Sequence, residues 1–177
     1  MVKKLLKFFA YALFFFGALG LFMPKSNLYY FVEKNLKTFN VVISDEVVTE
    51  KPFSLEVTNL NVRAQGVESA KVEQMNITLF LLYNRVSLEG IELSSLVENY
   101  LPSKIDSLEL VYSLVNPFYL EGQGSGDFGE ATFSFSLKTR ELTLRLQPSK
   151  KMLSRYKSSM RLFKKSENGE YLYAKNF

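Results

Sequence analysis

An uncharged run near the N-terminus, Phe8 to Met23 (FFAYALFFFGALGLFM), constrains this chain more than any other feature. Leu5 and Leu6 extend it across Lys7, whose long side chain can reach the lipid headgroups, so the run covers residues 5–23. A helix of about 19 residues rises about 28 Å, close to the hydrocarbon thickness of a bilayer. The sequence therefore predicts one transmembrane anchor over residues 5–23, with residues 1–4 before it.

The charges around the run predict its orientation. Lys3, Lys4 and Lys7 precede the apolar residues, and lysine and arginine concentrate on the cytoplasmic side of membrane helices. We therefore expect a cytoplasmic N-terminus at residues 1–4 and the rest of the chain beyond the membrane. A cleaved signal peptide is the alternative, but its apolar region would be unusually long. No small-x-small cleavage site follows, because the run continues directly to Pro24.

Residues 24–39 have the spacing of an amphipathic helix. Leu28, Phe31, Val32, Leu36 and Phe39 fall on one helical stripe after Pro24. Two placements fit this pattern: a collar helix lying on the membrane surface, or a helix packed on a sheet.

From residue 40 the apolar period changes to two, which predicts a β-rich domain over residues 40–177. A change of phase at Asn59 suggests a β-bulge there. Residues 128–137 and 141–147 read as a hairpin, and Asn168-Gly169 is a turn signal for a terminal hairpin.

Two further segments, residues 93–101 and 149–160, look helical. The expected fold is therefore mainly β: an N-terminal transmembrane helix followed by a curled antiparallel sheet with one to three short helices.

The composition excludes several kinds of catalytic or metal site. The chain has neither cysteine nor histidine, so a disulfide framework, a Cys/His zinc site and a His-based nucleophilic device are all impossible. Three carboxylate pairs, at Asp45-Glu46, Glu89/Glu92 and Asp106/Glu109, lack the flanking pattern of acid–base sites. We therefore expect a non-enzymatic protein with no catalytic, cofactor-binding or metal-binding residue.

The segment Glu121–Gly129 (EGQGSGDFG) holds the densest cluster of glycines. A phosphate-binding loop needs a helix after it, but an alternating strand follows this cluster. The cluster therefore indicates a turn or a twisted strand crossing.

Charge is distributed unevenly along the chain. Residues 24–137 carry 8 basic and 15 acidic residues, whereas residues 138–177 carry 11 basic and 3 acidic ones. The two halves can attract each other within one domain, or the basic part can face anionic headgroups or an acidic partner. The candidate contact residues for headgroups or a partner are Lys150, Lys151, Arg155, Lys157 and Arg161. Nucleic-acid binding is not expected of a domain held beyond a membrane.

The order of these features resembles type II secretion system protein N and the broader AsmA-like membrane-anchored β proteins. The likeness rests on the anchor ending at Pro24, the segment LYYFVEKNL at residues 28–36, the segment VISDE at 42–46, the strand FSLEVTNL at 53–60, the segment LEGQGSG at 120–126, and the hairpin ending LQPS at 146–149. It implies a single-pass protein of the Gram-negative inner membrane with a periplasmic β domain.

The resemblance leads to two hypotheses of function. The first is an accessory component of a bacterial envelope secretion machine, which contacts other secretion-system subunits in the periplasm. The second is a lipid-binding or lipid-transfer protein that holds phospholipid or lipopolysaccharide acyl chains in a curled sheet. The candidate groove-lining residues for the second are Phe133, Phe135, Leu142, Leu144 and Leu146.

Overall fold

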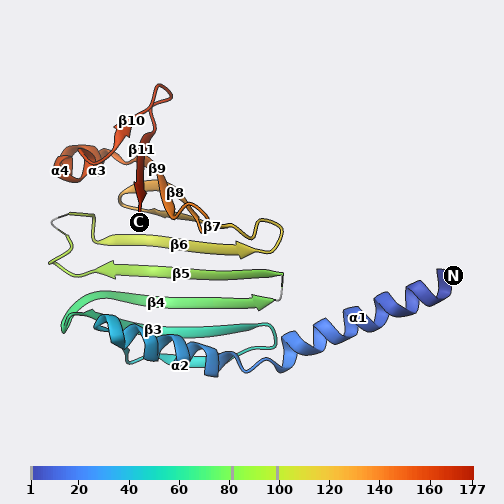
Figure 1. Ribbon diagram of the computed structural model, residues 1–177. Coiled ribbons are helices and arrows are strands. Elements are labelled where there is room, and N and C mark those ends of the chain that lie inside the picture. The colour runs from blue at the N-terminus through green and yellow to red at the C-terminus, as the bar shows by residue number, and fades with distance from the viewer. Residues whose placement is uncertain (1, 81, 99) are drawn as a thin grey trace.

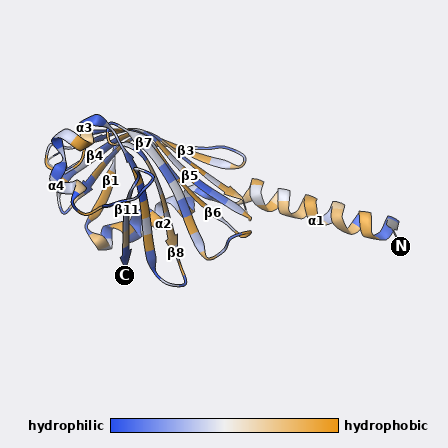
Figure 2. Ribbon diagram, turned by 90° about the horizontal axis from the view of Figure 1, so that it is seen from above, coloured by the Kyte–Doolittle hydropathy of each residue, from blue (hydrophilic) through white to orange (hydrophobic). Residues whose placement is uncertain are grey.

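The computed structural model describes residues 2–80, 82–98 and 100–177 and combines a long N-terminal helix with an antiparallel sheet (Figure 1). Helix α1 (Val2–Phe22) projects from one end of the sheet, and it is apolar along most of its length (Figure 2). Its segment Lys3–Phe22, 20 residues, is long and apolar enough to cross a membrane. The anchor expected over residues 5–23 is thus a continuous helix that begins slightly earlier.

Helix α2 (Lys25–Leu36) and the 3-10 turn η1 (Lys37–Phe39) occupy the stretch for which a second helix is expected. The helix packs on the sheet through Tyr29, which is only 6% exposed and belongs to the core formed with the sheet. The predicted apolar stripe does not face the sheet, however, because Leu28, Phe31, Val32 and Phe39 are exposed. The collar placement therefore stays a prediction.

The eleven strands of the described residues belong to one open antiparallel sheet, in the order β1-β3-β4-β5-β6-β7-β8-β9-β11-β10, with β2 also pairing β3. Strands β3 to β9 follow one another as consecutive neighbours, so each is joined to the next by a hairpin connection. The strands are β1 (Val41–Ser44), β2 (Val47–Glu50), β3 (Ser54–Ala64), β4 (Val67–Phe80), β5 (Tyr83–Leu93), β6 (Lys104–Ser113), β7 (Tyr119–Gly126), β8 (Gly129–Ser136), β9 (Glu141–Pro148), β10 (Lys164–Lys165) and β11 (Tyr171–Asn176).

The sheet is curled, as the sequence predicts. Strands β3 to β6 lie nearly flat in Figure 1, and strands β7 to β11 turn out of their plane on the side that α2 occupies (Figures 1 and 2). The hairpins at residues 128–147 and around Asn168-Gly169 are confirmed as β8–β9 and β10–β11.

The change of phase at Asn59 is confirmed, but its cause differs from the expected bulge. Asn59 has a positive φ of 58° and is unpaired, and Glu73 is skipped opposite it on β4. Because one residue is left unpaired on each strand, the alternation of inward and outward side chains shifts by one residue on β3 and on β4 at the same place. The register shift in this strand pair lies instead between Val62 and Arg63.

Two segments expected to be helical differ from that expectation. In the segment 93–101, Leu93 ends β5, and the described residues after it form hydrogen-bonded turns, with the amide of Glu98 donating to the carbonyl of Ser94. Asn99 lies outside the described residues. The segment 149–160 is helical but broken at Tyr156 into α3 (Lys150–Arg155) and α4 (Lys157–Met160).

The glycine-rich segment is mostly strand. Residues up to Gly126 form β7, and Asp127 and Phe128 make the turn to β8. Of the two expectations, the turn is found, at Asp127 and Phe128. The hydroxyl of Ser149 closes this region, because it donates to the carbonyl of Asp127 at 2.6 Å and accepts from the amide of Met152 at 3.1 Å at the start of α3.

Candidate functional site

One face of the sheet is apolar from β3 to β11. The strand register aligns its side chains in rows that cross the whole sheet. Of the three rows that reach β11, the one farthest from α1 runs Val57, Met75, Leu88, Leu108, Gly124, Ala131, Leu146 and Tyr171. The middle row runs Leu55, Ile77, Val86, Leu110, Gly122, Phe133, Leu144 and Tyr173. The row nearest α1 runs Leu79, Asn84, Tyr112, Leu120, Phe135, Leu142 and Lys175.

Helices cover this face at two places and leave the region between them uncovered. Around Tyr29, α2 closes a core over β3, β4 and β5. At the other end of the sheet, α3 and α4 close a second core, in which Met152, Tyr156 and Met160 pack on Leu146. On strands β6 to β11, eight partly exposed side chains of the two rows nearer α1 belong to neither core, and we call them the open face: Leu110, Tyr112, Leu120, Phe133, Phe135, Leu142, Leu144 and Tyr173.

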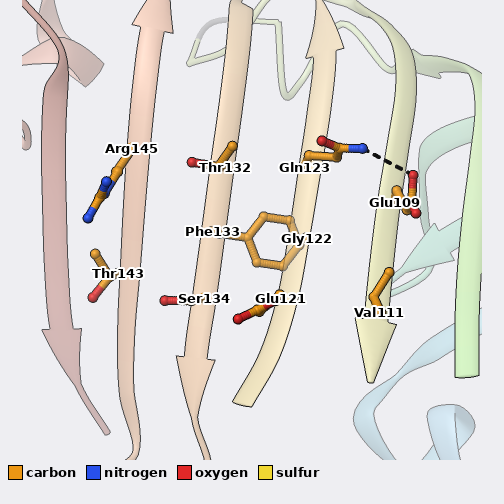
Figure 3. A pocket seen from close by; sticks show the side chains of 10 residues that line it. All are labelled: Glu109, Val111, Glu121, Gly122, Gln123, Thr132, Phe133, Ser134, Thr143 and Arg145. Atoms are coloured by element: carbon orange, nitrogen blue, oxygen red, sulfur yellow. Dashed lines mark hydrogen bonds between the residues drawn. The ribbon is translucent and has the colours of Figure 1, made fainter. Parts of the chain in front are cut away.

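Two glycines of β7 leave side-chain positions empty in the rows of this face. Gly122 and Gly124 stand in the rows where other strands carry side chains. A Cβ on Gly122 would overlap the ring of Phe133 and lie 2.5 Å from the carbonyl oxygen of Glu109. The missing side chain at Gly122 leaves room on β7, and the ring of Phe133 lies over this glycine (Figure 3).

Four of the five expected groove-lining residues lie on the open face. Phe133 pairs with Leu144 and Phe135 with Leu142 across β8 and β9, and all four are partly exposed. Leu146 differs, because it is 4% exposed and packs under α3 and α4. It is therefore a core residue.

The open face also contains residues that were not singled out from the sequence, among them Leu110, Leu120 and Tyr173. The alternation of Leu108, Leu110 and Tyr112 signals a half-buried strand. However, no pattern in the local sequence indicates that the helices leave these positions uncovered.

The opposite face of the sheet is polar. A shallow hollow of about 440 Å³ lies on β6 to β9 (Figure 3), where Glu109 binds Arg85 at 2.8 Å and accepts a hydrogen bond from the side-chain amide of Gln123 at 3.2 Å. Of the three carboxylate pairs, only Glu109 lies at this hollow, and its charge is satisfied by Arg85. Glu109 therefore forms a structural ion pair with Arg85.

The candidate basic residues lie on α3, α4 and the turn after them, at the end of the sheet opposite α1 (Figure 1). Lys151 binds Asp127 at 2.6 Å, and this hydrogen bond raises the pKa of Lys151. Arg155 lies 3.9 Å from Glu98. In the described part of the chain, no ion pair is found for the other three: Lys150, Lys157 and Arg161.

This position matters for the headgroup hypothesis. If α1 lies in a bilayer, these basic residues lie at the end of the sheet away from that bilayer, which disfavours contact with its headgroups. Contact with a partner stays a prediction.

The junction between α1 and α2 is tightly held. Lys25 is 1% exposed, and its ammonium donates to the carbonyls of Leu21 at 3.5 Å and Met23 at 3.3 Å, at the end of α1. Glu50 of β2 accepts the amide of Lys25 at 3.2 Å and the hydroxyl of Ser26 at 2.8 Å. These hydrogen bonds, that of Ser26 above all, lower the pKa of Glu50.

Comparison with family models, with curated proteins and with solved structures gives no match for this chain. The resemblance to type II secretion protein N and AsmA-like proteins therefore stays a prediction.

Proposed function

We propose that this protein is a membrane-anchored, non-enzymatic lipid-binding protein whose open face holds acyl chains. The observation that carries the proposal is that eight apolar side chains share one face of a curled sheet and belong to neither core. Contiguous exposed apolar surface of this kind marks a binding site in soluble domains.

The chemistry of the open face favours an acyl chain over a protein partner. Its side chains are aliphatic or aromatic, with hydroxyl groups only on Tyr112 and Tyr173. The backbone of strands β5 to β9 is paired within the sheet on both sides. A protein interface normally includes about one hydrogen bond per 100–200 Å², and the open face has few groups to supply them. A hydrocarbon chain needs none.

Polar groups border the open face on the side of α1. Asn84 and Lys175 belong to the row nearest α1, where they flank Tyr112 and Leu142. An acyl chain on the open face would place its headgroup beside these side chains, which can donate hydrogen bonds to ester or phosphate oxygens.

The compartment is part of the proposal. Lys3, Lys4 and Lys7 favour a cytoplasmic N-terminus, which puts the sheet on the other side of the membrane. The resemblance to periplasmic β proteins supports the Gram-negative inner membrane and the periplasm.

Native mass spectrometry of the detergent-solubilised full chain tests the proposal. We expect bound phospholipid or lipopolysaccharide at a fixed stoichiometry. Leu144→Asn should reduce the lipid-bound fraction, because it puts an amide on the open face. Thr143→Asn is the matched control, since Thr143 is the neighbouring residue on the polar face of β9. Lipid-free wild-type protein, or equal loss in both variants, would contradict the proposal.

A subunit of a secretion machine that acts by protein contact is the second candidate. It is favoured by the outer edge of β11, because β10 pairs only with Tyr171 and Leu172 and leaves the edge from Tyr173 to Asn176 without a neighbour in the described sheet. Such an edge can accept a strand from a partner. Stable co-purification of partner subunits without lipid would favour this candidate over the first.

A further inference from the structure

Several loops of the sheet meet at the end from which α1 emerges. Because Phe80 pairs with Tyr83, and Ser136 with both Tyr119 and Glu141, the turns between these strands all lie at this end. The β2–β3 connection joins them, since Leu55 pairs with Ile77 near the end of β4. Figure 1 shows this end of the sheet beside the end of α1.

These loops expose large apolar side chains. Val115 is 93% exposed and Phe118 is 57% exposed, both in the β6–β7 connection. Loop residues of this kind are normally polar, since they face water. We call the exposed apolar residues of these loops the anchor-end rim: Phe53, Phe80, Leu82, Leu114, Val115, Phe118 and Leu137.

The charges on the same loops have one sign. Lys51 in the β2–β3 loop and Lys138 and Arg140 in the β8–β9 loop are basic, and residues 51–53, 81–82, 114–118 and 137–140 include no acid. Lys51 is paired with Glu56. Neither Lys138 nor Arg140 has an ion-pair partner in the described part of the chain, so both can bind phosphate.

The contact between α1 and the rim sets the height of the rim relative to the span. Gly20 lies inside the apolar segment Lys3–Phe22. A Cβ on Gly20 would lie 3.4 Å from the ring of Phe53 and 3.7 Å from that of Phe80. Two rim side chains thus touch the anchor at a residue that itself belongs to the apolar span.

We propose that the anchor-end rim is immersed in the surface of the bilayer leaflet from which α1 emerges. Its apolar side chains lie at the boundary between headgroups and acyl chains, and Lys138 and Arg140 face the phosphates. Interfacial segments of this composition bind membranes in this manner. The sheet then stands on the membrane with the open face beginning at the lipid surface. This inference depends on α1 spanning the bilayer and is independent of whether the open face binds acyl chains.

The chain has no tryptophan, so one introduced indole reports its own surroundings. The test uses three single variants of the full chain, Val115→Trp, Phe118→Trp and Leu162→Trp. Each protein is reconstituted in vesicles of phosphatidylcholine and phosphatidylglycerol. The same proteins would be reconstituted with lipids brominated on their acyl chains, which quench a nearby indole. Leu162 is the matched control, because it is 67% exposed and apolar but lies after α4, at the opposite end of the sheet.

The brominated lipids should roughly halve the emission of the Val115→Trp and Phe118→Trp proteins, as expected for side chains at the acyl boundary. Emission from the Leu162→Trp protein should stay unchanged. Quenching of Val115→Trp and Phe118→Trp no greater than that of Leu162→Trp would overturn the inference. The two rim variants check each other, and a thermal unfolding curve of each protein confirms that it is folded.

The result also separates the rim from the proposed function. Lipid bound in native mass spectra without rim quenching would remove the rim inference alone. Rim quenching without bound lipid would remove the acyl-chain proposal alone.

Discussion

Gly122 shows how a single missing side chain shapes the apolar face. Its neighbours across the sheet, Leu110 and Phe133, both carry large side chains on the same face. The space that a Cβ would need at Gly122 is already occupied by the Phe133 ring and by backbone. Gly124 is less confined, because a Cβ there would lie 3.2 Å from Cδ1 of Leu108.

We therefore predict a graded loss of stability. Gly122→Ala should lower the free energy of unfolding by about 1–3 kcal/mol, the usual cost of overpacking, and Gly124→Ala should lower it by less. Thermal unfolding of the detergent-solubilised protein by circular dichroism measures both. Gly17→Ala is the control, since a Cβ there meets nothing within 4 Å. A Gly122→Ala protein that unfolds at the same temperature as the wild type would refute the close packing of Phe133 and the backbone around Gly122.

At the scale of elements, the short strand β2 connects the anchor to the sheet. Its last residue, Glu50, accepts hydrogen bonds from the first turn of α2, where the helix dipole is positive. The same turn follows the buried Lys25, whose ammonium binds the last carbonyls of α1. One carboxylate and one ammonium thus hold two helices and a strand at a single junction.

The lowered pKa of Glu50 predicts how stability depends on pH. A carboxyl group with a lower pKa in the folded than in the unfolded protein stabilises the fold above its ordinary pKa. This contribution is lost as the pH falls below 4.5, the ordinary value for glutamate, and through the lowered folded pKa. Wild type should thus unfold at a higher temperature than Glu50→Gln at neutral pH, and the difference should shrink on acidification.

The control for this prediction is Glu130→Gln, because Glu130 is exposed and its side chain makes no hydrogen bond or ion pair with another described residue. It should follow the wild type across the pH range. A difference between wild type and Glu50→Gln that stays constant from neutral to acidic pH would contradict the role of Glu50.

On the scale of the whole molecule, α1 is the element that would tie the sheet domain to a membrane. The helix has one face of contact with the domain, near Gly20, and exposes large side chains such as Phe14 and Phe15 along the rest of its length. In water such exposure is unfavourable, and in lipid it is the ordinary state of a membrane helix.

We predict that Phe14→Arg combined with Phe15→Arg releases the chain from membranes. Each arginine near the centre of a span costs about 2.5–3.5 kcal/mol of insertion free energy. The measurement is the fraction of full-length protein that stays in the membrane pellet after alkaline washing. Lys3→Arg combined with Lys4→Arg keeps the charge at the end of the span and should leave that fraction unchanged. Retention of the doubly charged helix in the pellet would show that the helix is not the anchor.

Strand positions with strict alternation could be predicted from local pattern alone, as the hairpin of β8 and β9 shows. Strand β2 could not, because four residues are too few for a period to emerge. The break at Tyr156 between α3 and α4 was also missed, since a continuous mix of basic and apolar residues does not mark where a helix turns. Leu146 alternates like Leu142 and Leu144, and only the packing of Met152 and Tyr156 makes it a core residue.

Local sequence alone predicts the apolar helix at the N-terminus, the two-residue period and the class of the fold. These features follow from the chemistry of neighbouring residues, since hydrophobic spacing and backbone geometry act over a few positions. The tertiary structure alone decides which part of the apolar face is covered and which loops gather beside the anchor. Those properties depend on α2, α3 and α4 packing against strands distant in sequence, and on the register that aligns eight strands into rows.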